Sequence, residues 1–172
     1  MRTWKCTLLL ATMTLALYGT NNPAYGQSQS VAPARAVAVE DDVRAFMRAV
    51  AHDVTQDGPT AWRKHFSDSP SFFMASEGRL VFPNSAAATA GIQAFAHTIK
   101  QIELRWGDDL RVDPLTTNLA IVAATWHEVQ VSTEGKRVEE TGFFTGCVEF
   151  RDGRWQFRDA HWSVAAPPPG AH

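Results

Sequence analysis

The chain has 172 residues, and its 16 Lys and Arg against 18 Asp and Glu give a formal net charge of −2 at pH 7. Hydrophobic residues make up 45% of the chain and charged residues 20%, which excludes a wholly disordered chain, a coiled coil and a collagen-like fibre. The near-neutral balance argues against a nucleic-acid partner, because nucleic-acid-binding proteins usually carry a strong basic excess. Two cysteines cannot build a disulfide framework, and no Cys/His cluster has the spacing of a metal site.

Residues 1–26 have the pattern of a secretory signal peptide. Arg2 and Lys5 supply the positive start, an apolar run follows over residues 6–18, and small residues stand at the end of the segment up to Gly26. We therefore expect cleavage near Gly26 and export, to the periplasm or as a secreted protein. The apolar run is shorter than the ~20 residues that a membrane span needs, so no span is expected after processing.

The remaining chain reads as one domain with two loose ends. Residues 27–38 are rich in Ser, Gln, Ala and Pro and predict a disordered spacer. Residues 39–164 form the domain, and the Pro-rich residues 165–172 predict a disordered tail.

Three helices are expected in the first half of the domain. A helix over residues 40–56 is indicated by apolar residues that recur every three or four positions, and Gly58 and Pro59 end it. A short helix follows over residues 60–66, and an Ala-rich helix covers residues 85–99. The apolar stripe of the first helix consists of Val43, Phe46, Met47, Val50 and Val54.

Strands fill the rest of the domain. A short hairpin is expected over residues 71–82, and the apolar period then changes to two. Long strands are predicted over residues 103–112, 119–131, 138–150 and 155–164. Helices followed by a run of antiparallel strands indicate an α+β fold, with the helices packed on one face of a strongly curved sheet.

The end of the domain resembles a known family. Residues 145–163 contain a strand, an Asp-Gly turn, Trp155 and a final strand with His161 and Ser163 in a His-x-Ser pattern. This order is similar to that of the nuclear-transport-factor-2-like superfamily, which includes the SnoaL-like proteins. The resemblance implies a cone, in which three N-terminal helices pack in a curved mixed or antiparallel sheet around a pocket. Members include isomerases, dehydratases, cyclases, epoxide hydrolases and proteins with no known activity.

The last strand holds the candidate catalytic residues. Strict alternation places Trp155, Phe157, Asp159, His161 and Ser163 on one face, which we assign to the concave side because it starts with aromatic residues. Asp159 would then orient His161 for acid–base catalysis. His161 lining the pocket without catalysis, or bonding within the structure, are the alternatives.

Other candidates lie on the helices and the earlier strands. Trp62, Phe66, Met74 and Phe95 are predicted to line an apolar cavity, with ordinary core packing as the alternative. Trp126 and its neighbour His127 point to opposite faces of their strand, and periodicity leaves open which of them reaches the pocket, because both faces are apolar. Glu139 and Glu140 have the pattern of a solvated hairpin end.

These features favour an exported SnoaL-like protein that binds a small, mostly apolar molecule. The alternatives are a cofactor-free acid–base enzyme (isomerase, dehydratase, cyclase or hydrolase) that uses His161 and Asp159, or a protein-binding domain whose cone is filled by side chains. No nucleotide, metal or cofactor motif is present. We also expect a homodimer through an apolar outer sheet face that includes Phe144 and Trp162.

Overall fold

The apolar stripe predicted for the first helix is the buried face of α1 (Pro33–Asp57) in the computed structural model, which describes residues 31–165. The helix begins at Pro33, so the prediction of a disordered spacer is wrong for residues 33–38. Proline suits the first turn of a helix, and alanines at 34, 36 and 38 have high helix propensity. The predicted signal peptide, residues 27–30 and most of the predicted tail lie outside the described residues. No helix in that described part is long and apolar enough to cross a membrane.

Shorter helices follow α1. Gly58 ends α1 with a φ of 79°, and the chain turns into the 3₁₀ helix η1 (Pro59–Ala61) and then α2 (Trp62–His65). Helix α3 (Ser85–Thr98) is capped by Asn84, whose side-chain oxygen accepts a hydrogen bond of 2.8 Å from the Ala87 amide.

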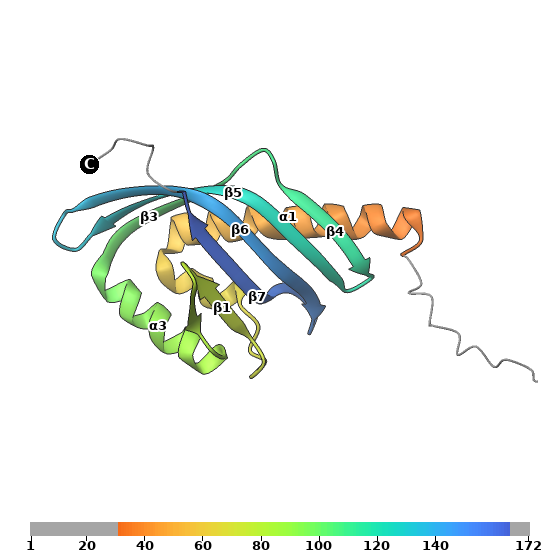
Figure 1. The fold of residues 1–172 in the computed structure, drawn as a ribbon, viewed down its shortest axis with the longest axis horizontal. Coiled ribbons are helices and arrows are strands. Elements are labelled where there is room, and N and C mark those ends of the chain that lie inside the picture. The colour runs from red at the N-terminus through yellow and green to blue at the C-terminus, as the bar shows by residue number, and fades with distance from the viewer. Residues whose placement is uncertain (1–30, 166–172) are drawn as a thin grey trace, which may run out of the picture.

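Seven strands form one curved sheet (Figure 1). Along the sheet the order is β2-β1-β7-β6-β5-β3, and β4 also pairs with β5. The β1–β7 pair is parallel and the other pairs are antiparallel, so the sheet is mixed. The strands are β1 (Phe73–Ser76), β2 (Arg79–Phe82), β3 (Ile99–Trp106), β4 (Arg111–Thr116), β5 (Leu119–Ser132), β6 (Arg137–Arg151) and β7 (Arg154–Val164).

The first long strand is divided in the structure. One strand was predicted over residues 103–112, whereas β3 and β4 are separated after Trp106 and pair with different parts of β5. At the break, Asp109 Oδ1 accepts hydrogen bonds from the backbone N and Oγ1 of Thr125, at 2.9 and 2.8 Å. The turn-forming residues Gly107, Asp108 and Asp109 are the signal for this break.

A β-bulge in β7 changes which face each side chain takes. Cys147 of β6 pairs with Asp159, whereas Val148 pairs with Phe157, which leaves Arg158 as the extra residue. An extra residue reverses the alternation after it. Phe157 and Trp162 therefore both point inward, although the strict alternation predicted them on opposite faces.

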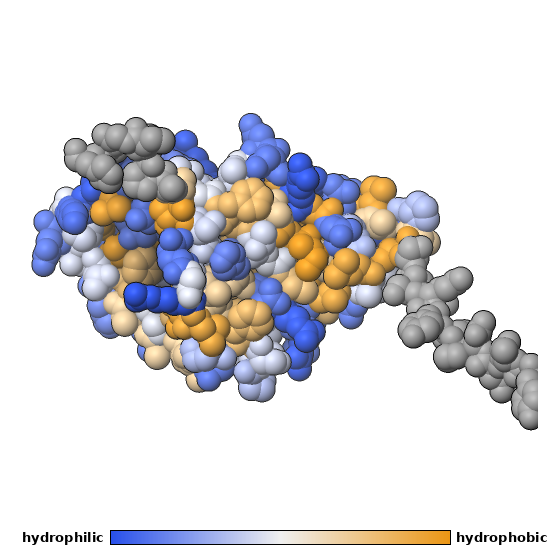
Figure 2. Space-filling view, viewed as in Figure 1, coloured by the Kyte–Doolittle hydropathy of each residue, from blue (hydrophilic) through white to orange (hydrophobic). Residues whose placement is uncertain are grey.

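The core lies between α1 and the concave face of the sheet, and this confirms the predicted α+β class. Phe144 is fully buried there and Trp162 packs against it with ring centroids 4.8 Å apart, so the placement of both on the outer face is wrong. The indole N–H of Trp106 donates to the Met47 carbonyl at 2.8 Å and ties the sheet to α1. In the space-filling view of Figure 2, apolar patches alternate with polar residues across the visible surface.

Candidate functional site

A pocket of about 440 Å³ opens where the first hairpin, α3 and the concave face of the sheet meet. Aromatic and aliphatic side chains make most of its wall, and the polar side chains Ser76, Glu128, Gln130 and Glu140 complete it. A mostly apolar concavity with a few convergent polar groups is the usual form of a small-molecule site. Its apolar lining consists of Trp62, Phe66, Met74, Val81, Phe82, Ile92, Phe95, Trp126, Trp162 and Val164, with Gly91.

Most of the predicted pocket-lining residues meet in this cavity. Trp62, Phe66, Met74, Phe95 and Trp126 all line it, although they come from two helices, a loop, a hairpin and the long strands. Trp62 and Phe66 also belong to the buried core, so these two residues both line the pocket and pack in the core.

The two other residues predicted to line the pocket lie elsewhere. His127 faces outward, since its neighbour Trp126 faces inward, and its Nε2 lies 2.8 Å from Glu139 Oε1. The Ser163 hydroxyl donates to the Phe143 carbonyl at 3.1 Å. Both predicted placements are corrected, and for Ser163 the reason is the bulge at Arg158.

The candidate catalytic pair does not reach the pocket. Because of the bulge, His161 is exposed on the outer face, and the prediction that it shares the pocket wall with Asp159 is wrong. Asp159 Oδ1 instead accepts a hydrogen bond of 3.1 Å from the Cys147 amide. The pKa of Asp159 is raised by burial, and this hydrogen bond and the nearby Arg158 offset the rise only in part.

Glu128, Gln130 and Glu140 are polar pocket residues on β5 and β6, and the sequence alone assigned none of them to the pocket. The signal was present, because Glu128 and Gln130 share the face of Trp126, two and four residues before them. Glu128 stands directly opposite Glu140 across the β5–β6 pair. Glu140 is exposed, as expected for a solvated hairpin end, and it also lines the pocket, whereas its neighbour Glu139 points away from it.

The environment of Glu128 favours its neutral form. Burial raises the pKa of this carboxyl above its ordinary value of 4.5; the hydrogen bond from Gln130 lowers it, and the charge of Glu140 raises it further. Trp126, which is 4% exposed, has an indole N–H without a hydrogen-bond partner among the described residues. This wall therefore holds polar groups that the fold itself satisfies incompletely.

A second acid–base pair lies away from the pocket. His65, which is 7% exposed, has Nε2 at 3.1 Å from Asp53 Oδ2, and its ring packs edge-on against Phe46. The pKa of His65 is lowered by burial, and the charge and the hydrogen bond of Asp53 offset this only in part. The pair joins α2 to α1, and this packing accounts for it as a structural contact.

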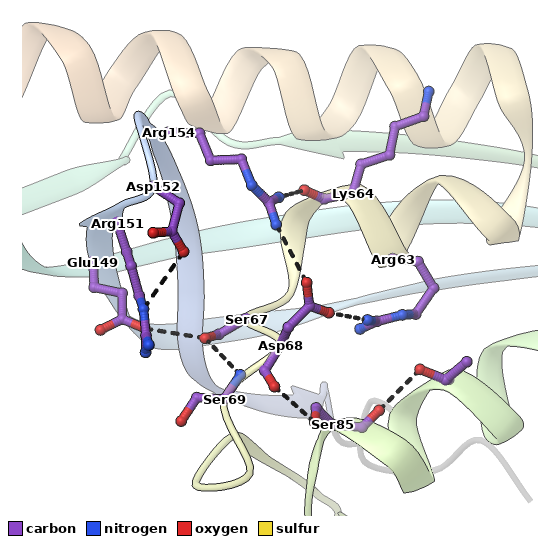
Figure 3. Close-up of polar contacts among 11 residues, drawn as sticks. Arg63, Lys64, Ser67, Asp68, Ser69, Ser85, Glu149, Arg151, Asp152 and Arg154 are labelled. Carbon is purple, nitrogen blue, oxygen red and sulfur yellow. Dashed lines mark hydrogen bonds and ion pairs between the residues drawn. The ribbon is translucent and has the colours of Figure 1, made fainter.

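A polar cluster ties the loop before β1 to the β6–β7 turn (Figure 3). Asp68 pairs with Arg63 and lies 3.7 Å from Arg154, and the Ser67 hydroxyl donates to Glu149 Oε1 at 3.0 Å. Acidic and basic side chains alternate through the cluster, so their charges neutralise one another. The cluster connects the two loops and offers no binding site for an ion of either sign.

Comparison with known proteins gives the fold. No protein-family model matches the sequence, and no curated protein is significantly similar to it. Among solved structures, a nuclear transport factor 2 (NTF2-like) superfamily protein from Salmonella enterica aligns with a TM-score of 0.65 at 15% identity, covering 79% of this chain and 98% of that one. An NTF2-like protein of unknown function from Shewanella oneidensis aligns with a TM-score of 0.56 at 18% identity, over 72% and 98% of the two chains.

An enzyme shares the same architecture. A hexachlorocyclohexane dehydrochlorinase, LinA-type3 from Novosphingobium barchaimii, aligns with a TM-score of 0.59 at 14% identity, over 79% of this chain and 94% of its own. These identities show similarity of fold alone. The chain therefore has the nuclear-transport-factor-2-like fold that its closing strands predicted.

Proposed function

We propose that the pocket binds a small, mostly apolar molecule. The observation that carries the proposal is the cavity of about 440 Å³, whose wall is mainly aromatic and aliphatic and whose carboxylate and amide side chains lie on β5 and β6. A cone filled by its own side chains, the third hypothesis from the sequence, is disfavoured by this volume. Burying an apolar ligand surface there gains roughly 25 cal/mol per Å².

Filling the pocket tests the proposal. Ser76 lines the cavity, whereas Ala75, the preceding residue of β1, faces the other side of the sheet. Fluorescence titration with Prodan, a neutral naphthalene dye, should show saturable binding of one dye per chain. Ser76→Phe should weaken this binding by about tenfold or more through steric exclusion. Ala75→Phe adds the same ring outside the cavity and should leave binding unchanged.

Two outcomes would contradict the pocket proposal. Dye binding that does not saturate would indicate nonspecific adsorption to exposed apolar surface. Equal losses in the two phenylalanine variants would place the dye outside the cavity or reflect a general loss of folding, which circular dichroism of both variants separates.

A second candidate function is acid–base catalysis by Glu128. The observation that favours it is a carboxyl with a raised pKa in an apolar cavity, a combination that suits a general base or acid. Glu128 thereby replaces His161 and Asp159 as the candidate for the enzymatic alternative, because it is Glu128 that reaches the pocket.

A generic base substrate tests this second function. In 5-nitrobenzisoxazole a carboxylate removes the ring C–H proton; the C–H electron pair completes a nitrile, and the N–O bond breaks to leave a coloured phenolate. If Glu128 is a competent base, the protein should accelerate this ring opening, and Glu128→Gln should lower the rate about 100-fold. Glu139→Gln, which changes an outward carboxylate, should keep the rate. A rate that Glu128→Gln leaves unchanged would exclude the base role.

A further inference from the structure

We propose that the molecule bound in the pocket carries a protonated amine, which the carboxylates of Glu128 and Glu140 hold while the aromatic walls enclose its apolar body. This inference rests on the proposed binding function and adds the chemical class of the ligand.

The two carboxylates face each other at the pocket, with Glu128 half-buried and Glu140 exposed. Glu128 and Glu140 are directly opposite each other on the inner face of β5 and β6, and side chains in such positions have Cβ atoms about 5 Å apart. Like charges in directly opposite positions destabilise a sheet. On its other side, Glu128 pairs in register with Leu104, which is 3% exposed and apolar.

The surrounding residues supply no positive charge to offset the pair. Among the described residues that line the pocket, none is a lysine, an arginine or a histidine. Gln130 donates the hydrogen bond that Glu128 receives, and the charged neighbour that acts on Glu128 is Glu140. A half-buried carboxylate without a counter-charge is costly, and a ligand cation between the two carboxylates would remove both the desolvation cost and the repulsion.

The rest of the wall suits the same ligand. Trp62, Trp162 and Phe66 present aromatic rings to the cavity, with the Trp62 and Trp162 ring centroids 5.5 Å apart at right angles. Aromatic faces attract ammonium groups and enclose apolar carbon at the same time. An anionic ligand would meet the carboxylates unfavourably, and a neutral ligand would leave them uncompensated.

Matched probes test the inference by isothermal titration at about pH 8, well above the ordinary glutamate pKa of 4.5. The probes are 1-adamantanemethylamine, 1-adamantanemethanol and adamantane-1-carboxylate, which share one compact apolar body and differ in charge. The amine should bind at least about tenfold more tightly than the alcohol, and the carboxylate most weakly. Glu128→Gln and Glu140→Gln should each reduce the amine-to-alcohol affinity ratio severalfold, whereas Glu139→Gln should keep the ratio.

The other outcomes separate this inference from the function on which it rests. Equal affinity of the amine and the alcohol overturns the amine inference and leaves apolar binding intact. Failure of all three probes to bind a protein that still binds Prodan also overturns it. Failure of Prodan as well overturns the proposed function together with the inference.

Discussion

Glu128 lies in a pocket wall whose other residues do not neutralise its charge. Its neighbours are an apolar leucine at position 104, an amide at Gln130 and a second carboxylate at Glu140. A sequence selected for stability alone would place an apolar or oppositely charged side chain here. Departures from such local rules concentrate at functional sites, and the pocket wall holds one.

Glu128→Gln should therefore stabilise the protein above the ordinary glutamate pKa. Because the pKa of Glu128 is raised in the folded protein, the folded state keeps this proton to higher pH than the unfolded chain does. Stability is then lost as pH rises from 4.5 through the raised value. Urea unfolding should show a gain of about 1 kcal/mol for Glu128→Gln at about pH 8 and none at about pH 4.

Glu139 is the matched comparison because its pKa is shifted in the opposite direction. The hydrogen bond with His127 lowers the pKa of Glu139 below 4.5, and the interaction with Arg137 lowers it further. The contribution of Glu139 to stability is therefore present above that pH and is lost as the pH falls. Glu139→Gln should thus reduce stability at about pH 8. If Glu128→Gln also destabilised at that pH, our account of the pocket carboxylates would be wrong.

At the scale of elements, the bulge at Arg158 decides the character of the site. It turns Trp162 into the core and leaves His161 on the outer face. Removing the extra residue would restore simple alternation and force the second half of β7 either to expose Trp162 or to lose its register with β6.

Deleting Arg158 should consequently destabilise the fold strongly. Moving the partly buried Trp162 out of its aromatic cluster costs about 2 kcal/mol or more. Arg158→Ala keeps the bulge and removes only an exposed side chain whose Nη1 lies 4.0 Å from Glu149 Oε2, so it should cost less than about 0.5 kcal/mol. Thermal unfolding of both proteins measures the difference. A deletion variant as stable as Arg158→Ala would show that β7 tolerates either register.

Elements with strong periodicity were predictable from the sequence, and backbone irregularities were not. The stripe of α1 and the hairpin of β5 and β6 follow from apolar spacing. The bulge has no signal in the sequence, because Arg158 is an ordinary exposed residue. It becomes the extra residue only through the register in which β7 pairs with β6. The pocket carboxylates were visible as residues, but whether Trp126 or His127 faces inward depends on helices that pack against the sheet, which strand periodicity does not report.

At the scale of the whole molecule, the outer sheet face carries exposed apolar side chains among polar ones, although Phe144 and Trp162 are inside. Phe73, Ile121 and Phe143 are exposed on it by 44%, 39% and 42%. Phe73 and Ile121 lie in one cross-strand row through Asp159 and Cys147. We propose that this face pairs with a second copy of the chain, and His161 would then lie at the interface.

Phe143→Glu should convert this dimer into a monomer, because a buried, unpaired carboxylate at the interface is costly. Sedimentation velocity at micromolar concentration would follow the change, with circular dichroism as the check that the variant folds. Since the side chain points away from the pocket, Prodan affinity should be preserved. A wild-type protein that sediments as a monomer would refute the dimer and leave the pocket account untouched.

If a small molecule enters the pocket, the tryptophan indoles report on it directly. Trp62, Trp126 and Trp162 line the cavity, whereas Trp155 packs against Phe150 outside it with ring centroids 5.6 Å apart. In a ¹⁵N-correlated NMR titration with Prodan, the indole signals of the three lining tryptophans should shift together and saturate while that of Trp155 stays in place. A shift confined to Trp155, or no indole shift at a concentration where the dye is bound, would contradict the account.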